Sequence, residues 1–104
     1  MAKTLRNLKI QRDRRHVVAT LNMIFPGYMD GEELYRTVLD MNPEYTRSFL
    51  AKDLHYLRDK GYLTHRRRDG TDEPGITIRE CQFKLTADGT DVANKFVDDP
   101  ALDI

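Results

Sequence analysis

Residues 54–63 of this chain read LHYLRDKGYL, and this stretch decides how the elements on either side of it are ordered. Leu54 and Leu57 are three positions apart, so a helix places both side chains on one face. Gly61 suits the position just after a helix, because glycine adopts a left-handed backbone without steric cost. The stretch therefore predicts a helix that ends at about residue 60 and a strand that opens at Tyr62.

The helix that ends here is predicted to span residues 44–60, with Asn42 as its cap and Pro43 at the start of its first turn. Leu50 extends the stripe of buried leucines toward the N-terminus of this helix. A second helix over residues 31–41 comes directly before it, and a tight turn separates the two. Two helices in this arrangement form a helix-turn-helix pattern.

Capping and periodicity predict the rest of the helical part. Asp30 followed by Glu33 has the spacing of a capping box at the start of helix 31–41. Tyr28 and Met29 are predicted to form a short bridge before it. A first helix is predicted from about Leu8 to Phe25, where Pro26-Gly27 stops it. Its apolar side carries Val17, Val18, Leu21, Ile24 and Phe25.

The part of the chain after residue 61 predicts a hairpin and a last helix. Residues 62–64 open a strand, residues 69–75 are rich in turn formers, and residues 76–85 suit a returning strand. Ile76 and Ile78 are out of phase with Cys81, Phe83 and Leu85, so a bulge near Arg79-Glu80 is needed to bring all five to one side. Thr86 is then predicted to cap a short helix over residues 87–97.

Two stretches give the chain a resemblance to a known group of proteins. They are residues 54–63 and residues 83–89, which read FKLTADG. With the element order, they resemble the winged helix-turn-helix domains of the MarR and PadR groups of bacterial transcriptional regulators, over about residues 17–97. The resemblance implies an α+β, mainly helical fold with a three-helix bundle, a two-stranded wing over residues 64–79 and a short C-terminal helix. It also implies that helix 44–60 is the recognition helix.

Length and composition favour a single domain over residues 1–104, with a basic extension at 1–7 and an acidic tail at 98–104. Lys plus Arg and Asp plus Glu each number 17, so the net charge is zero. Basic residues nevertheless dominate the first twenty positions, and acidic residues dominate the last eighteen. The lone cysteine excludes an internal disulfide, and no apolar run suits a signal sequence or a membrane span. We therefore expect a cytoplasmic protein.

If helix 44–60 is a recognition helix, its outward face is the expected contact with DNA. With the leucine stripe pointing inward, Lys52 points outward and Arg47 lies at the flank, and both side chains can donate to guanine. Hydroxyl groups can bind phosphate. The expected set is Tyr45, Thr46, Arg47, Ser48, Lys52 and His55. The alternative is a solvated helix face without a ligand, because polar residues cover any exposed helix.

Basic residues also precede the expected tip of the wing, where the phosphate backbone or the minor groove would lie. They are His65, Arg66, Arg67 and Arg68. Alternation along a strand sends Arg66 and Arg68 to one face of the sheet and Arg67 to the other. The alternative is that these arginines only protect an edge strand from pairing with another chain.

Two further groups of residues have two interpretations each. Arg12, Arg14 and Arg15 either contact flanking phosphates or pair with the acidic C-terminal segment. The aromatic side chains of the third helix share one side, where packing against the core is expected rather than stacking on bases. They are Tyr45, Phe49 and Tyr56.

The sequence offers no pattern for catalysis, a metal ion or a cofactor. His16, His55 and His65 have no shared metal-ligand spacing, and Cys81 is expected to be buried in an apolar strand. No glycine-rich phosphate loop and no signature of a catalytic nucleophile is visible. We therefore expect a protein that is not an enzyme and holds no metal or cofactor.

The sequence thus predicts sequence-specific binding of double-stranded DNA by a small transcriptional regulator. The alternative is a winged-helix module for protein interactions in a replication, phage or mobile-element complex. Zero net charge favours this alternative, and so do the acidic residues Asp53, Asp59, Asp69, Asp72 and Glu73. The resemblance also implies a homodimer formed by the terminal helices, with Leu5, Leu8, Ile10, Val92 and Phe96 as the available residues.

Overall fold

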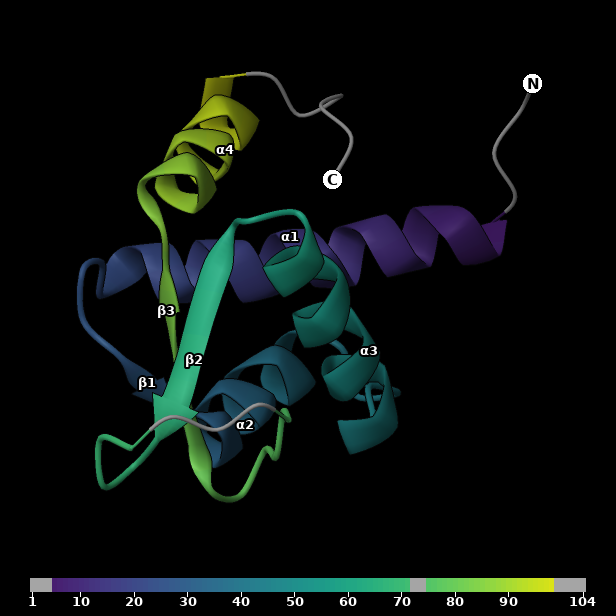
Figure 1. Ribbon diagram of the computed structural model, residues 1–104. Coiled ribbons are helices and arrows are strands. Elements are labelled where there is room, and N and C mark those ends of the chain that lie inside the picture. Colours follow the sequence, from purple (N-terminus) through teal and green to yellow (C-terminus); the bar gives the residue numbers. More distant parts are fainter. Residues whose placement is uncertain (1–4, 72–74, 99–104) are drawn as a thin grey trace.

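The computed structural model describes residues 5–71 and 75–98, with side chains described within 8–71 and 75–95. Within these residues the architecture is α+β and mainly helical, with four helices and one three-stranded antiparallel sheet (Figure 1). The predicted fold class is confirmed at this level. In chain order the elements are α1 (Leu5–Met23), β1 (Met29–Asp30), α2 (Gly31–Met41), α3 (Arg47–Asp59), β2 (Leu63–Arg67), β3 (Cys81–Leu85) and α4 (Ala87–Asp98).

The long helix α1 runs behind the sheet and α3 in Figure 1, and its N-terminal half projects beyond them. Its second half carries buried apolar residues, including Val17 and Leu21. The helix begins and ends earlier than predicted. Ile24 and Phe25, predicted on its buried side, are exposed after its end. Their N–H groups bind the carbonyls of Leu21 and Asn22, and this tighter turn rotates both side chains away from the core.

The segment predicted as a bridge before α2 contains a strand, β1. Met29 lies opposite Phe83 of β3, and Asp30 lies opposite Gln82. Asp30 stands at the N-cap position of α2, but its side chain makes no capping hydrogen bond. Its Oδ1 accepts a hydrogen bond from Nε2 of Gln82 at 3.0 Å instead. The predicted capping box is therefore wrong, because the neighbouring strand takes the carboxylate.

The helix α3 begins three residues later than predicted, with Thr46 as its cap. The Oγ1 of Thr46 accepts a hydrogen bond from the N–H of Phe49 at 3.1 Å. Asn42, the predicted cap, closes a turn by accepting from the N–H of Glu44 at 3.1 Å. Its Nδ2 also donates to Oδ1 of Asp13 at 3.0 Å. The contact between Asn42 and Asp13 of α1 therefore lengthens the turn between α2 and α3, and α3 begins later.

The sheet has the strand order β1-β3-β2, and both pairs are antiparallel. Leu63 lies opposite Leu85, and Arg67 lies opposite Cys81. The change of phase required by the sequence is present, but β3 starts at Cys81 and not at residue 76. A turn in which the N–H of Cys81 binds the carbonyl of Thr77 makes the change, rather than a bulge in a continuous strand. Ile76 and Ile78 lie before that turn and pack against the core.

The two stretches that carry the family resemblance contact each other. The hydroxyl of Thr86 donates to the carbonyl of Gly61 at 2.6 Å, and the N–H of Thr86 binds the carbonyl of Tyr62 at 3.0 Å. The same hydroxyl accepts from the N–H of Gly89 at 3.1 Å. A Cβ atom at Gly89 would overlap the carbonyl oxygen of Tyr62. We call this contact the Thr86 junction.

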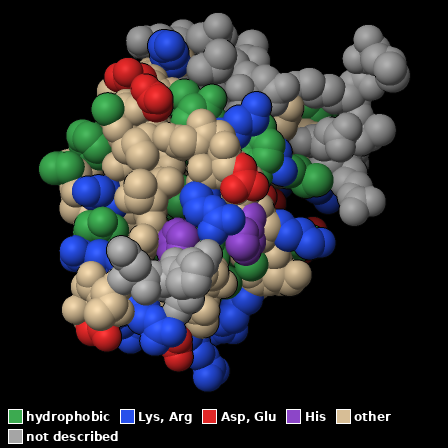
Figure 2. Space-filling model, in the orientation of Figure 1, with side chains coloured by type: hydrophobic (Ala, Val, Ile, Leu, Met, Phe, Trp, Pro, Cys, Tyr) green, Lys and Arg blue, Asp and Glu red, His purple; other side chains and the backbone are tan. Residues whose placement is uncertain are grey.

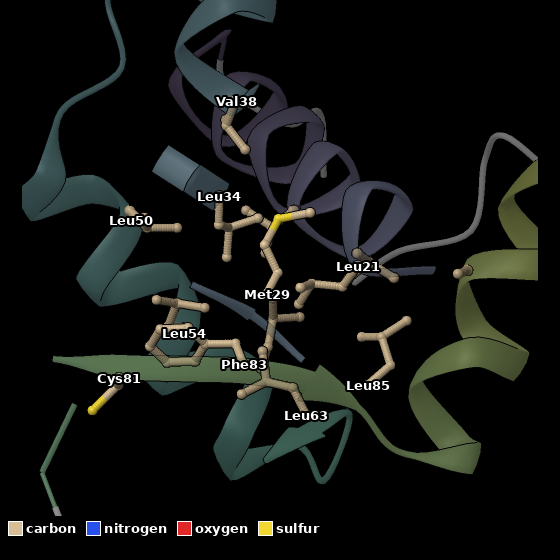
Figure 3. Packing of buried hydrophobic residues seen from close by; sticks show 14 of the residues in the cluster. Leu21, Met29, Leu34, Val38, Leu50, Leu54, Leu63, Cys81, Phe83 and Leu85 are labelled. Atoms are coloured by element: carbon tan, nitrogen blue, oxygen red, sulfur yellow. The ribbon is translucent and has the colours of Figure 1, made fainter. Parts of the chain in front are cut away.

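One apolar core joins the helices to the sheet. Phe83 of β3 is fully buried at its centre, and Met29 reaches the same cluster from β1 (Figure 3). Helices and strands far apart in the sequence contribute the surrounding side chains. They are Leu21 of α1, Leu34 and Val38 of α2, Leu50 and Leu54 of α3, Leu63 of β2, and Cys81 and Leu85 of β3. This core fixes which side of α3 faces solvent.

Candidate functional site

The outward side of α3 is polar and exposed. Ser48, Lys52 and His55 are exposed on the side of the helix opposite the buried Leu50, Leu54 and Leu57. Because Ser48, Lys52 and His55 are spaced four and three residues apart, they form one continuous row, which we call the α3 stripe. Figure 2 shows basic side chains and histidines gathered on the face that α3 and β2 turn toward the viewer.

Two residues of the predicted contact set, Thr46 and Arg47, are engaged within the protein. Thr46 is exposed, and its hydroxyl caps α3. Arg47 is exposed and binds Glu32 through Nη2–Oε2 at 2.8 Å and Nε–Oε1 at 3.2 Å. Its guanidinium also lies 4.6 Å from the ring centre of Tyr35. The hydrogen bond from Arg47 lowers the pKa of the Glu32 carboxyl and raises the pKa of the guanidinium.

Tyr45 does not belong to the exposed face, so the prediction that its side chain points outward is wrong. The residue lies before α3 and is only 2% exposed. Its hydroxyl donates to Oδ2 of Asp53 at 2.7 Å. Burial, followed by the charge of Asp53, raises the pKa of this phenol. The late start of α3 explains the error, because Tyr45 follows the turn and not the helical periodicity.

The exposed end of α3 carries its own ion pair. Nη2 of Arg58 lies 3.2 Å from Nδ1 of His55 and 3.5 Å from Oδ1 of Asp59. Asp59 is one of the acidic residues expected to oppose a polyanion. The nearby Arg58 offsets its charge at the surface.

On the outer face of the sheet, a polar row crosses all three strands. Nε of Arg66 donates to Oε1 of Gln82 at 3.3 Å, and Gln82 in turn donates to Asp30. The guanidinium of Arg66 lies 3.8 Å from the ring centre of Tyr28, and Nζ of Lys84 lies 4.9 Å from the same centre. Arg66 is therefore held against the sheet, a contact that the sequence did not predict.

The other basic residues of the hairpin have different surroundings. His65 is half-buried, and its ring stacks on Phe83 with 6.2 Å between centres. Arg67 and Arg68 are exposed, and Nε of Arg68 lies 3.6 Å from Oδ1 of Asp30. Arg66 and Arg68 thus both reach the row of Asp30, as the alternation predicts.

The acidic residues expected at the hairpin tip are only partly described. Oδ1 of Asp69 accepts from the N–H and the hydroxyl of Thr71, at 2.9 and 2.6 Å. These bonds lower the pKa of the Asp69 carboxyl. Asp72 and Glu73 lie outside the described residues.

The arginine cluster of α1 does not act as one group. Arg12 is exposed, whereas Arg15 is half-buried. Nε of Arg14 lies 3.4 Å from Oδ1 of Asp53, and its guanidinium is 3.6 Å from the ring centre of Tyr56. Of the two interpretations, Arg14 therefore follows the structural one, although its carboxylate partner is on α3. Residues 99–104 of the expected acidic partner segment lie outside the described residues.

Two aspartates at the contact of α1 and α3 are buried, which the sequence does not predict, since Asp53 is expected there to face solvent and oppose a polyanion. Asp13 is 7% exposed and Asp53 is 5% exposed. Burial raises the pKa of Asp53 to about 6, although the hydrogen bond from Tyr45 and the charge of Arg14 act in the opposite direction. The available signal was that both aspartates occupy apolar stripes, Asp13 one turn before Val17 and Asp53 between Leu50 and Leu54.

A cavity of about 330 Å³ opens beside these carboxylates, between α1, the turn before α3, and α3. Phe49 lines it and is 49% exposed, so the prediction that Phe49 packs in the core is wrong. Its ring centre is 6.3 Å from that of Tyr45, at the edge of the packed region. The lining residues are Lys9, Ile10, Asp13, Arg14, Asn42, Glu44, Phe49, Lys52 and Asp53.

Other features of the described residues bear on what the protein can do. No group of three or more His, Cys, Asp or Glu side chains among them is placed to hold a metal ion. Cys81 is a buried free thiol. In the same part of the chain, none of the helices has the length and apolar character needed to cross a bilayer. Comparison with known proteins gives no match to a family model, to a curated protein or to a solved structure.

Proposed function

We propose that this protein binds double-stranded DNA as a small winged-helix transcriptional regulator in the cytoplasm. The observation that carries the proposal is the α3 stripe, in which the hydroxyl of Ser48, the amine of Lys52 and the imidazole of His55 face solvent together. These groups stand on the second helix of a helix-turn-helix pattern, the element that enters the major groove in such proteins. The element order and the strand order β1-β3-β2 are compatible with a winged helix.

In this proposal the two parts of the face have different tasks. Lys52 donates to base edges in the major groove, where guanine presents two acceptors. Arg67 and Arg68 of the hairpin lie against phosphates and supply affinity that does not depend on sequence. Arg14 takes no part, because Asp53 and Tyr56 hold it.

Two arginines of the face are paired with carboxylates in the free protein, Arg47 with Glu32 and Arg68 with Asp30. Both arginines are about half exposed in these pairs. Ion pairs at the surface contribute little to stability, because water and salt screen them. A phosphate that approaches either arginine can therefore replace the carboxylate with a charge-assisted hydrogen bond of its own.

A fluorescence-anisotropy titration with a labelled random duplex tests the proposal. We expect binding at about 50 mM salt, with an affinity that falls linearly on a logarithmic salt axis. Arg67→Ala with Arg68→Ala weakens binding to all sequences and lowers the salt slope by about two units. Lys52→Ala mainly reduces the preference among sequences. Lys95→Ala is the matched control, because it removes the same charge from α4, at the other end of the molecule from the start of α3 (Figure 1).

The second candidate function is a protein-interaction module, and the exposure of apolar residues at the C-terminal end of α1 favours it. Met23 is 73% exposed, and Ile24 and Phe25 follow it on the surface. Adjacent exposed apolar side chains of this kind mark protein contacts more often than single ones do. Absence of duplex binding at about 50 mM salt by the folded protein overturns the first proposal and supports this one.

We also propose that the protein forms a homodimer through its terminal helices. Leu8 is exposed on α1, and Ile10 of the same helix is half-buried. Val92 of α4 packs partly against the core, whereas the side chains of Leu5 and Phe96 lie outside the described set. Size-exclusion chromatography with light scattering tests this proposal, and a monomer mass at all concentrations contradicts it.

A further inference from the structure

The cavity between α1 and α3 has apolar side walls and carboxylates at its buried end. Ile10 and Phe49 supply apolar surface, while the carboxylates of Asp13 and Asp53 stand at the buried end. Lys9 and Lys52 are exposed and stand at the rim. The volume of about 330 Å³ falls at the lower end of the range of small-molecule sites. We propose that this cavity binds a small organic amine in its cationic form.

Asp13 is the residue that selects the charge of the ligand. Its Oδ1 accepts a hydrogen bond from the neutral amide of Asn42 at 3.0 Å. The residue is only 7% exposed, and a carboxylate in such a position with one neutral donor is costly unless a cation compensates it. An ammonium group in the cavity supplies a positive charge and a further hydrogen-bond donor.

Two of the three cationic residues that line the cavity lie close to carboxylates, and the third, Lys52, is exposed at the rim. Arg14 binds Asp53 through Nε at 3.4 Å and lies over the ring of Tyr56, so its charge offsets one of the two carboxylates. At the rim, Nζ of Lys9 lies 3.9 Å from Oε2 of Glu44. The buried end therefore carries one carboxylate more than it has cations, and an anionic ligand would meet repulsion there.

The walls define the rest of the ligand. Phe49 of α3 is 49% exposed and lines the cavity with its aromatic ring. Ile10 of α1 supplies another apolar part of the cavity wall. An apolar or aromatic body attached to the amine would cover this surface and remove it from water. The class is thus a compact amine with one apolar group. This inference does not depend on DNA binding, because its argument rests on Asp13, Ile10 and Phe49, which belong neither to the α3 stripe nor to the hairpin.

Three isosteric probes test the charge preference on the unmodified protein by ¹H–¹⁵N NMR titration at neutral pH. They are phenethylamine, which is a cation, 2-phenylethanol, which is neutral, and phenylacetate, which is an anion. We expect saturable shifts from phenethylamine at the amides of Ile10, Asp13 and Phe49, with a dissociation constant at least about tenfold below that of the alcohol. Phenylacetate is expected to bind most weakly of the three.

Variants locate the effect within the cavity. Asp13→Asn keeps the shape of the side chain and is expected to remove the preference for the amine over the alcohol. Phe49→Ala weakens both probes by a similar factor, since it removes apolar surface only. Asp91→Asn, which removes the same charge from an exposed position on α4, leaves all three affinities unchanged. Equal binding of the amine and the alcohol, tighter binding of phenylacetate, or no saturation by the amine up to about 10 mM overturns the proposal.

Discussion

The Thr86 junction and the start of α3 are built with the same local device and differ in everything around it. In each, a threonine hydroxyl accepts a hydrogen bond from an N–H group three residues later, at 3.1 Å. At the junction, the same hydroxyl also joins two chain segments through the carbonyl of Gly61. At the start of α3, the long-range contacts come from other residues, among them Asp53, which binds Arg14 of α1. The difference teaches that a local signal locates a helix end only where distant contacts agree with it.

The largest expected effect breaks the junction by steric overlap. Gly89→Ala places a methyl group against the carbonyl oxygen of Tyr62, and backbone atoms cannot rotate away. We expect a loss of about 3 kcal/mol in the free energy of unfolding, near the upper end for overpacked sites. Urea denaturation followed by circular dichroism measures it.

Gly61→Ala is the matched control for this change. Gly61 has a φ of 79°, and a Cβ atom there meets nothing within 4 Å. The expected loss of about 1 kcal/mol comes from the left-handed backbone alone. A larger loss for Gly61→Ala than for Gly89→Ala would contradict the role assigned to the junction.

The next effect breaks the buried pair at the start of α3. Tyr45→Phe removes the hydroxyl that donates to Asp53 at 2.7 Å and leaves a buried carboxylate without that donor. We expect a loss of about 2 kcal/mol in the free energy of unfolding, measured in urea. The control is Tyr35→Phe, since its hydroxyl makes a longer bond of 3.4 Å to the carbonyl of Tyr45. Equal losses for the two variants would show that Asp53 does not depend on Tyr45.

Replacing the two capping threonines compares the regions directly. Thr46→Ala removes one hydrogen bond, to the N–H of Phe49, and is expected to cost about 1 kcal/mol. Thr86→Ala removes the bond from Gly89 and also the bond to the carbonyl of Gly61, so a loss of about 2 kcal/mol is expected. Thermal unfolding of both variants measures the difference. If Thr46→Ala proves the more damaging, the distinction between the regions fails.

The smallest effect is a dependence of stability on pH. Because burial raises the pKa of Asp53 from 3.8 to about 6, the folded state binds the proton more tightly than the unfolded state does. The contribution of this group is thus greatest below pH 4 and is lost as the pH rises through 6. Between pH 7 and pH 5 we expect stability from this group to increase by about 1 kcal/mol.

Asp53→Asn isolates that contribution, because every other titrating group remains. Burial lowers the pKa of His16, which acts in the opposite direction over the same range, so only the difference between the two proteins is informative. Melting temperatures at pH 5 and pH 7 supply it. Identical pH dependence in both proteins would show that Asp53 does not titrate in this range.

The sequence indicated the elements that rest on periodicity and on residues with special backbone behaviour. Helix 31–41 has the bounds that the sequence predicts, and the leucine stripe of α3 lies in the core as its spacing predicts. Gly61 ended the third helix near the predicted position, and the change of phase before Cys81 was recognised. These signals act between residues a few positions apart, so no knowledge of the rest of the chain is needed.

Several of the errors share one physical cause. Asn42 and Asp30 are good helix caps in isolation, but Asp13 and Gln82 bind their side chains in the folded protein. Tyr45 was counted as exposed because the predicted helix began too early. The side chains of Asn42 and Asp30 could each bind a backbone group nearby or a side chain far away in the sequence. The spacing of residues in the sequence does not reveal the distant partner.

The sequence by itself determined the α+β, mainly helical class, the order of the four helices and of the two hairpin strands, and which side of α3 is apolar, because helix and strand periods are local properties. The tertiary structure alone decided which basic residues stay exposed, which are held by Glu32, Asp30 and Asp53, and that Asp13 ends at the floor of a cavity. Those outcomes depend on the meeting of α1, α3 and the sheet. The free energy of a charged side chain is set by the neighbours that folding brings to it.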